Sequence, residues 1–316
     1  MNDRSGIEEN GTDDEELMAL VAWYYYHDGL TQGDIGDRLG ISRIKVSRLL
    51  EKGRQSGIVR VTINSPFEGC FRLQDALQQE FGLRNARVIP RLDDVPVGER
   101  VAQAAAQYLM RELNDGDLLA IGWGDTVSRT LRRMMPMLTG RKVELVSLTG
   151  GVAAYLDGTG FRGGQSNIHL IPTPLRVSSP SFAKALREEP FVRDVIAMAL
   201  TAKVALLGIG SLAIDATLVS NGYCSRSELD LFRRQGAVGD ILGFFYDANG
   251  AVLPLDLHEH VVSVEPDRLN AVETRIAAAA GSHKVDAIRA AMRGNHVDVL
   301  ITDEPTAEAI LESIRK

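Results

Sequence analysis

Residues 30–63 read LTQGDIGDRLGISRIKVSRLLEKGRQSGIVRVTI, and this stretch decides how the N-terminal part of the chain folds. Thr31 is a favourable N-cap for a short helix over residues 32–39. Gly40 permits a left-handed turn, and Ser42 can cap a second helix that runs from Arg43 to about Ser56. Two short helices joined by a glycine-containing turn of three or four residues predict a helix-turn-helix.

The apolar positions around this stretch agree with that prediction. Gly36 is small at the point where the second helix must cross the first. A preceding helix is expected, because apolar residues recur in steps of three and four between Leu17 and Tyr25. Residues 58–63 alternate like a strand and predict a wing. The residues expected to hold the two helices together are Ile35, Leu39, Ile41, Val46 and Leu49.

The charge of the chain is unevenly distributed. The net formal charge is -7, and residues 1–16 are strongly acidic. Residues 38–60, in contrast, carry seven basic residues against Glu51 alone, a local excess of six positive charges. Such a basic stripe favours a local anionic partner such as nucleic acid, since a patch rather than the net charge contacts phosphate. The alternatives are a solvated helix face, an ordinary helical hairpin, or a helix-turn-helix that binds protein.

The second helix of the pair presents its N-terminal side chains to the major groove in helix-turn-helix proteins. Arg43 and Arg48 are the candidates for base reading, since a guanidinium can bond O6 and N7 of guanine together. Gln32, at a helix N-terminus, is the candidate for a phosphate contact. The predicted DNA-binding residues are Gln32, Ser42, Arg43, Lys45, Ser47, Arg48 and Lys52.

A connecting helix is expected within residues 66–83, where Leu73, Leu77 and Phe81 are spaced four apart. This apolar face either pairs with a second subunit or packs on its own domain. We therefore divide the chain into a helix-turn-helix domain over residues 1–64, a connecting helix over 65–85 and a larger domain over 86–316.

The larger domain alternates apolar runs with helical stretches. Continuous apolar strands followed by helices predict a mostly parallel α/β sheet covered on both faces. The expected strands lie within residues 86–90, 117–124, 142–151, 167–172, 203–210, 241–247, 260–264, 274–281 and 297–305. The expected helices lie within residues 101–113, 127–137, 182–200, 284–292 and 306–314.

Glycines gather at three of the strand ends, within residues 122–126, 148–151 and 208–211. Ligands of such sheets bind beyond the carboxyl ends of the strands, where glycines let backbone N–H groups approach an anion. Strand-to-helix turns also need glycine for their own sake. The dinucleotide fingerprint is incomplete, because position 127 is Val, and there is no P-loop. Hydride transfer and nucleotide hydrolysis are therefore disfavoured.

Two charged residues are candidates for ligand binding in this domain. Asp240 stands between glycines in residues 236–243 and can accept hydrogen bonds from ligand hydroxyls, or it is simply a turn aspartate. Lys284 opens a helix after residues 277–283 (AAAAGSH) and can neutralise a phosphate, or it is a surface lysine.

Composition excludes several other classes. No apolar run approaches the ~18 residues of a membrane span, and no secretory leader is visible. Cys70 and Cys224 are the only cysteines, and they form neither a disulfide framework nor a zinc pattern. We expect a soluble cytoplasmic protein without a metal or cofactor, and there is no Gly-x-Ser-x-Gly nucleophile motif.

The combination resembles the SorC family of bacterial transcriptional regulators over nearly the whole chain. The most specific motifs are LTQGDIGDRLGISRIKVSRLLEKGRQSGIVRVTI (30–63), LTGG (148–151), LLGIG (206–210), GAVGDILGFFYD (236–247) and LITDEPTA (300–307).

The resemblance implies a Rossmann-like ligand domain similar to glucosamine-6-phosphate deaminase and ribose-5-phosphate isomerase, used here for sensing. It also implies an effector that is a phosphorylated sugar, a phosphorylated polyol or phosphorylated autoinducer-2, and a homo-oligomer (dimer or tetramer) on double-stranded operator DNA. An isomerase or deaminase with an accessory DNA-binding module is the alternative. The effector-binding residues implied are Gly122, Trp123, Gly124, Thr126, Thr149, Gly150, Gly151, Asp240 and Lys284.

Overall fold

The computed structural model describes residues 9–61, 65, 67–92, 95–151, 168–213 and 216–315. The chain separates into two compact units, Met1–Ser65 and Pro66–Lys316, and each is described by itself. Among the described residues, no helix is both long and apolar enough to cross a membrane.

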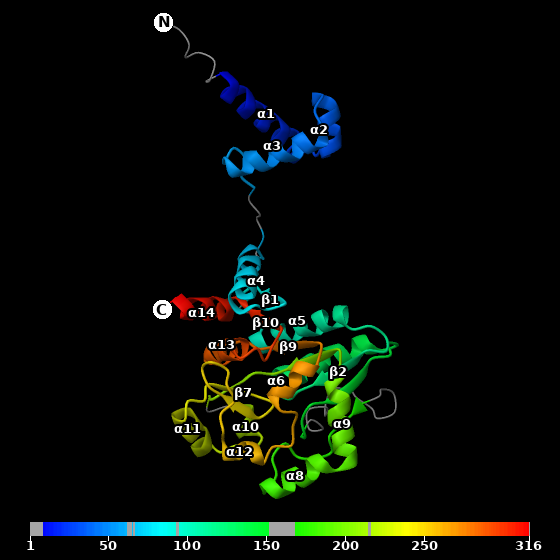
Figure 1. The fold of residues 1–316 in the computed structure, drawn as a ribbon, viewed down its shortest axis with the longest axis vertical. Coiled ribbons are helices and arrows are strands. Elements are labelled where there is room, and N and C mark those ends of the chain that lie inside the picture. Colours follow the sequence, from blue (N-terminus) through cyan, green and yellow to red (C-terminus); the bar gives the residue numbers. More distant parts are fainter. Residues whose placement is uncertain are drawn as a thin grey trace. The chain divides into compact units, whose positions relative to one another are not determined.

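The smaller unit is a three-helix domain built from α1 (Glu9–Tyr26), α2 (Gln32–Leu39) and α3 (Arg43–Gln55) (Figure 1). The capping prediction is confirmed: the Asp34 N–H donates to Thr31 Oγ1 (3.2 Å), and the Thr31 N–H donates to Asp34 Oδ2 (3.1 Å). Gly40 ends α2 in the left-handed conformation at φ 64°. The apolar core includes Ile35, Val46 and Leu49 as predicted, together with Met18, Val21, Ala22 and Leu50.

The predicted wing strand at residues 58–63 is wrong for residues 58–61, which form no strand. The Val59 N–H instead donates to the carbonyl of Gly53 in α3 (2.9 Å), and Ile58 and Val59 pack on the core of the small unit. Residues 62 and 63 lie outside the described residues. Ile58 and Val59 therefore pack on a helical core, whereas Val61 is 59% exposed.

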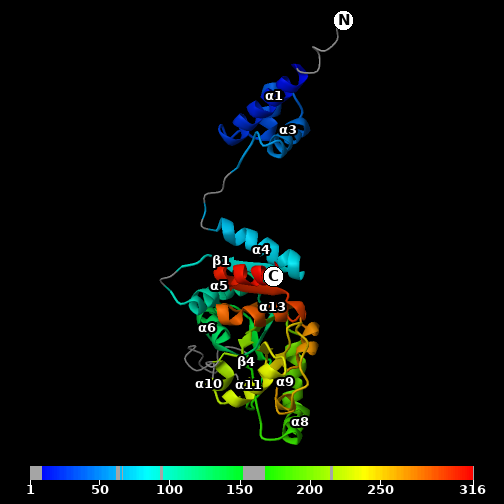
Figure 2. The ribbon, with the colours of Figure 1, turned by 90° about the vertical axis from the view of Figure 1, so that its left-hand side faces the viewer.

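The connecting helix is α4 (Glu68–Phe81), and it packs within the larger unit. Leu77 is fully buried, while Leu73 and Phe81 are half-buried against the same core. Of the two roles considered for this apolar face, the structure therefore supports packing on its own domain. Figures 1 and 2 both show α4 beside α14 (Glu304–Arg315).

A seven-stranded parallel sheet forms the centre of the larger unit, in the order β1-β10-β9-β5-β2-β3-β4. Every residue of β5, β9 and β10 is buried, and because alternate side chains point to opposite faces, both faces must be covered. This confirms the predicted α/β class. The strands are β1 (Asn85–Ile89), β2 (Leu118–Ile121), β3 (Glu144–Ser147), β4 (Ile168–His169), β5 (Val204–Leu207), β9 (Thr274–Ala278) and β10 (Val299–Asp303).

Helices and turns connect these strands. They comprise α5 (Val97–Glu112), α6 (Asp125–Met134), η1 (Met135–Leu138), α8 (Pro180–Glu188), α9 (Pro190–Leu200), α10 (Thr217–Ser220), α11 (Arg226–Arg234), α12 (Asp256–Glu259), η2 (Pro266–Ala271), η3 (Ser282–Lys284) and α13 (Val285–Arg293). The single helix predicted over residues 182–200 is wrong. The chain there forms α8 and α9, because Pro190 cannot continue a preceding helix and the residue before it is extended.

A small antiparallel sheet, β6-β7-β8, lies beside the main one. The single strand predicted over residues 241–247 is wrong. The chain there forms a hairpin of β7 (Gly239–Ile241) and β8 (Phe244–Tyr246), and β7 also pairs with β6 (Gly210–Ser211). The strand predicted over residues 260–264 is also wrong. Only isolated bridges form there, from Val261 to Arg176 and from Ser263 to Thr149.

The crossing of α2 and α3 leads to a stability prediction. A β-carbon added at Gly36 would lie 2.7 Å from the carbonyl oxygen of Ile41, whereas one added at Gly33 would meet only Thr31 Oγ1 at 3.7 Å. We expect Gly36→Ala to destabilise the small unit by about 1–3 kcal/mol. Gly33→Ala, the matched control, should be neutral or stabilising by up to about 1 kcal/mol. Hydrogen exchange at the amides of α2 and α3 measures both, and equal protection in the two variants contradicts the crossing argument.

Candidate DNA-binding surface and effector cavity

The N-terminal half of α3 forms an exposed polar surface. Ser42 is the N-cap, and its Oγ accepts a hydrogen bond from the Lys45 N–H (3.2 Å). All the predicted side chains of this segment are exposed, namely Ser42, Arg43, Lys45, Ser47 and Arg48. Ile44 is 68% exposed among them, and sequence reasoning missed it. An exposed aliphatic group at this position suits contact with a thymine methyl.

Gln32 and Arg43 lie at the first positions of α2 and α3, and both line one surface hollow with Tyr25 and Thr31. Helix N-termini present unpaired N–H groups that bind phosphate. The structure thus brings a predicted phosphate contact and a predicted base contact to one surface. Lys52 differs, because its Nζ lies 3.2 Å from Asp14 Oδ2 of α1 and is directed toward that helix.

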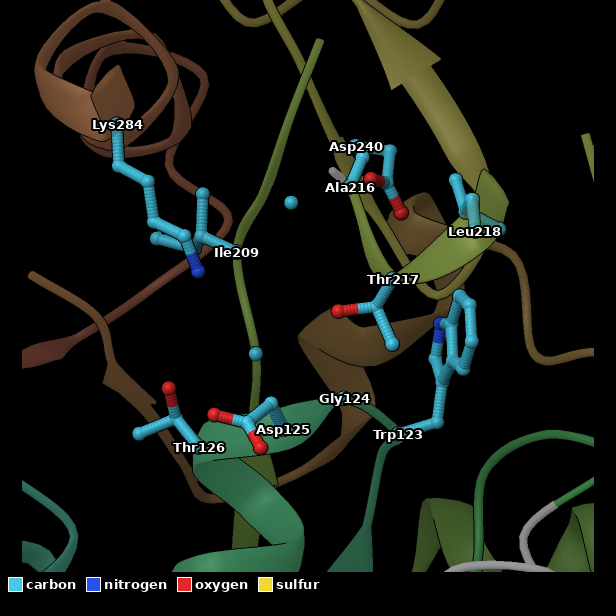
Figure 3. Close-up of a pocket in the computed structure, with 12 residues that line it drawn as sticks. Trp123, Gly124, Asp125, Thr126, Ile209, Ala216, Thr217, Leu218, Asp240 and Lys284 are labelled. Carbon is cyan, nitrogen blue, oxygen red and sulfur yellow. The ribbon is translucent and has the colours of Figure 1, made fainter. Parts of the chain in front are cut away.

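The candidate site of the larger unit lies at the carboxyl ends of β2 and β5. These strands are neighbours in the sheet, yet the chain continues from β2 to β3 on one side and from β5 to β9 on the other. Open α/β sheets bind ligands at such a switch point. The cavity there is lined by Trp123, Gly124, Asp125, Thr126, Gly208, Ile209, Gly210, Ala216, Thr217, Leu218, Asp240 and Lys284 (Figure 3).

Asp240 is a buried acid in this cavity, 4% exposed, and its carboxylate faces the same space as Thr217 and Lys284 (Figure 3). Burial raises the pKa of this carboxyl to about 6, against the smaller opposing effects of the Gly243 N–H and the Lys284 charge. The Gly243 N–H donates to Asp240 Oδ2 at 3.3 Å. Because this N–H is the one donor to the carboxylate among the described residues, Asp240 is well placed to accept hydrogen bonds from ligand hydroxyls.

The backbone around Asp240 is built to hold its carboxylate. Asp240 pairs with Gly210 across β6 and β7, and a β-carbon on Gly210 would lie only 1.8 Å from Asp240 Oδ1. The β7–β8 turn contains Leu242 at φ 56°, a conformation that is rare for a bulky side chain, followed by Gly243 at φ 85°. Two residues with positive φ give the tight hairpin that aims the Gly243 N–H at the carboxylate.

The N-terminus of α6 forms the floor of the cavity near Thr126. Its N-cap is Gly124, at φ 125°, which has no side chain to cap the helix. The Arg129 Nε–H donates a hydrogen bond to Asp125 Oδ2 (2.6 Å), and Arg129 also forms an ion pair with Glu99 of α5. Because Arg129 offsets the Asp125 charge, the uncapped N–H groups of α6 remain suited to an anion.

Trp123 forms one wall of the cavity and packs edge-to-face on Tyr223, with ring centroids 5.4 Å apart. Behind Tyr223 lies Gly151, since a β-carbon there would be 2.6 Å from the Tyr223 hydroxyl. Gly150 is equally confined by the backbone of Thr173 and Pro174. The glycines of the LTGG motif therefore pack behind Tyr223, which in turn contacts Trp123 in the cavity wall.

The structure does not bring every predicted effector residue into the cavity. Trp123, Gly124, Thr126, Asp240 and Lys284 line it, but Gly122, Thr149, Gly150 and Gly151 are not among the described lining residues. Gly122 is confined between Leu242 and the carbonyl of Leu206, and Thr149 is fully buried. Sequence reasoning missed Ala216, Thr217 and Leu218, which lie in none of the motifs. Asp125 and Ile209 lie within the glycine-rich segments 122–126 and 208–211, but they were not among the predicted effector residues.

The cavity has a small inner part and a larger outer part. The inner part, of about 40 Å³, includes Asp240 and Trp123, and the outer part, of about 440 Å³, continues along α6. The two share Asp125, Gly210, Ala216, Thr217 and Lys284, and the outer part adds Ser128, Arg132, Ser211, Ser220, Asn221 and His283. Asp240 and the N-terminus of α6 thus share the inner part, whereas the outer part is lined mainly by polar and charged side chains.

Within the described part of the chain, no group of three or more His, Cys, Asp or Glu side chains could hold a metal ion. His258 lies on α12, where its Nε2 accepts a hydrogen bond from the Phe245 N–H (2.9 Å). Burial lowers the pKa of this imidazole to about 4, so it is a neutral packing group behind β8.

Comparison with protein families assigns both units. Residues 65–312 match the family Sugar-bind, described as "Putative sugar-binding domain", and residues 13–56 match Sigma-70, region 4. The chain belongs to the SorC family of bacterial transcriptional regulators with a sugar-binding domain.

Individual relatives carry a more specific name. The chain is 48% identical to the transcriptional regulator LsrR of Enterobacter sp. (strain 638) over 94% of this chain and 93% of that protein. It is 45% identical to LsrR of Escherichia coli (strain K12) over 98% of both. The crystal structure of the full-length sorbitol operon regulator SorC from Klebsiella pneumoniae superposes with a TM-score of 0.70 at 28% identity, covering 94% of this chain and 98% of that one.

These relatives establish a DNA-binding, sugar-responsive transcriptional regulator, and they do not favour the isomerase or deaminase alternative. The expected resemblance to the SorC family is confirmed.

The exposed α3 surface leads to a prediction about DNA reading. Arg43→Ala should lower the preference for the specific site by about ten- to a hundredfold, because one bidentate base contact contributes about 1–3 kcal/mol of discrimination. Salt-sensitive binding to unrelated DNA should remain. Competition binding at fixed salt measures this, with Lys52→Ala as the control. An unchanged sequence preference in Arg43→Ala would refute the assigned role.

Burial of Asp240 leads to a prediction about stability. Its folded pKa of about 6 exceeds the ordinary value of 3.8. The carboxylate is therefore unfavourable in the fold, with no cost below pH 4 and the full cost above pH 6. Asp240→Asn should stabilise the larger unit by roughly 3 kcal/mol at pH 8, and not at pH 4.

Urea unfolding measures this effect. In a Trp23→Phe background, Trp123 is the single tryptophan and reports on the larger unit. Exposed Asp256→Asn is the control and should show no such pH dependence. An equal effect of Asp240→Asn at both pH values would argue against a charged buried group.

Proposed function

We propose that the chain is a repressor whose affinity for operator DNA changes when a phosphorylated sugar or polyol binds at the carboxyl ends of β2 and β5. The observation that carries the proposal is the pairing, in one cavity, of the buried Asp240 carboxylate with Lys284 and the uncapped α6 N-terminus. Carboxylates accept bonds from hydroxyls, whereas ammonium groups and helix N-termini favour phosphate.

The regulated genes in this proposal serve uptake or catabolism of the effector. The curated relatives carry the name LsrR, so phosphorylated autoinducer-2, and with it a role in quorum sensing, is one candidate. The relative of known structure is a sorbitol operon regulator, so phosphorylated polyols are the other. We further propose that the protein acts in the cytoplasm and binds double-stranded operator DNA as a homodimer or homotetramer.

The effector acts only to the extent that it binds two states of the protein with different affinity. In the proposed mechanism, the DNA-bound state presents paired α3 helices at the spacing of two half-sites, and the effector stabilises a second arrangement that misplaces them. The same coupling free energy then weakens effector binding when DNA is bound.

The test is fluorescence anisotropy of DNA from the promoter region of the protein's own gene, at fixed salt, titrated with phosphorylated sugars, phosphorylated polyols and phosphorylated autoinducer-2. One compound should change DNA affinity, and its unphosphorylated form should not. Asp240→Ala should keep DNA binding and lose the response, whereas Asp256→Ala should retain both. A wild-type response in Asp240→Ala would place the effector elsewhere, and absence of specific DNA binding would remove the regulator function itself.

A further inference from the structure

Ile44 of α3 is 68% exposed, more than any other large apolar residue that the structure describes. Its chain neighbours Arg43 and Lys45 are exposed as well, and Ile44 takes no part in the core of the small unit. A β-branched side chain also favours a helix less than Arg or Lys does. Neither core packing nor helix propensity therefore explains an isoleucine here. Since single exposed apolar residues are ordinary, the direction of the side chain decides what it can contact.

The helical period places Ile44 on the outermost side of α3. Four buried residues mark the side of this helix that faces the core, namely Val46, Leu49, Leu50 and Gly53. Ile44 and Arg48 each stand two residues from Val46, and at about 100° per residue this puts both about 160° around the helix axis from it. They are one turn apart and exposed, so both side chains project away from the small unit on the same side.

The charge along this outer side shows which part of it suits DNA. Glu51, two turns beyond Ile44, is the only acidic residue of α3, and it is exposed. Because phosphate repels a carboxylate, a DNA contact on this side belongs to the first two turns, which hold Ile44 and Arg48. In helix-turn-helix proteins, the N-terminal residues of the second helix are the ones that contact base edges.

We propose that Ile44 is a specificity-determining residue, which packs on the 5-methyl group of a thymine in each operator half-site, beside a guanine bound by Arg48. Thymine is the only base with a methyl group in the major groove, and an aliphatic side chain is matched to it. Four helical residues span about 6 Å, and bases of one strand are about 3.4 Å apart, so the thymine lies about one or two base pairs from the guanine. This contact rests on the proposed operator binding through α3, and it is independent of the effector.

Removal of a single methyl group from the DNA tests this contact. Footprinting of the full-length protein on DNA from the promoter region of its own gene first defines the shortest specific fragment. Each thymine of that fragment is then replaced singly by deoxyuridine, which pairs with adenine in the same way but lacks the methyl group. Wild-type protein should lose about fourfold in affinity at one thymine of each half-site, the amount expected for one buried methyl group. Competition anisotropy at fixed salt, without effector, measures the loss.

A substitution in the protein separates this contact from other effects of the methyl group. Ile44→Ala should bind the unmodified fragment more weakly, and the same deoxyuridine should cause no further loss. Hydrogen exchange at the amides of α3 checks that this exposed substitution leaves the helix folded. Val61→Ala shortens a 59% exposed aliphatic residue of the same unit outside α3, and as the matched control it should keep the wild-type pattern.

A second change in the DNA restores the methyl group in a different base pair. Cytosine or 5-methylcytosine, each paired with guanine, replaces the sensitive thymine, and the two fragments differ only in that methyl group. Wild-type protein should prefer the fragment with 5-methylcytosine by about fourfold, whereas Ile44→Ala should bind both equally.

Three results overturn the proposal. If deoxyuridine weakens binding of the wild type and of Ile44→Ala equally, another group contacts the methyl. If no deoxyuridine in the fragment weakens binding, Ile44 contacts no thymine methyl, although operator binding itself stands. If the wild-type protein binds no fragment specifically, the proposed operator binding fails together with this contact.

Discussion

The parallel pairing of β2 with β5 is the constraint on which the ligand-binding unit depends. These strands lie side by side, but the chain leaves them in opposite directions, so their carboxyl ends cannot be closed by one connection. Gly208 and Gly210 allow the chain around this gap to pack closely, and Gly124 provides the φ of 125° at the turn into α6. Strand β7 of the β7–β8 hairpin then supplies Asp240, a buried acid that lines the cavity.

The electrostatic design of the cavity works against the stability of the fold. Asp240 is buried with one backbone donor, and the bulky Leu242 beside it has an unfavourable φ angle. Both features cost free energy that a purely structural loop would avoid. Asp125, which also lines the cavity, differs from Asp240 because its carboxylate forms an ion pair with Arg129. Arg129 in turn pairs with Glu99 of α5. Asp240 thus differs from Asp125 in having no described cation beside its carboxylate at ion-pair distance, which fits the ligand-binding role that we propose for it.

Local features of the fold were predictable from sequence, and long-range ones were not. Thr31, Gly40 and Ser42 act within a few residues of themselves, so the helix-turn-helix and its caps follow from spacing alone. Asp240 and Lys284 were identifiable as charged residues in glycine-rich or helix-opening contexts. The LTGG glycines were assigned to the effector because a glycine that accommodates a ligand and one that accommodates Tyr223 look alike in sequence. Thr217 and Leu218 reach the cavity only through the tertiary fold, which no motif encodes.

The contact between Gly210 and Asp240 restricts how this sensor can diverge. The carboxylate occupies the volume of the missing side chain, so any larger residue at position 210 is compatible only with a smaller or absent acid at position 240. The two positions should therefore change together or remain fixed in descendants of this sequence. If ligand binds in the proposed site, new preferences are then accessible mainly through Ile209, Thr217 and Leu218, which line the same cavity without that steric coupling. Evolution of specificity in this lineage would leave the acid in place and reshape the walls around it.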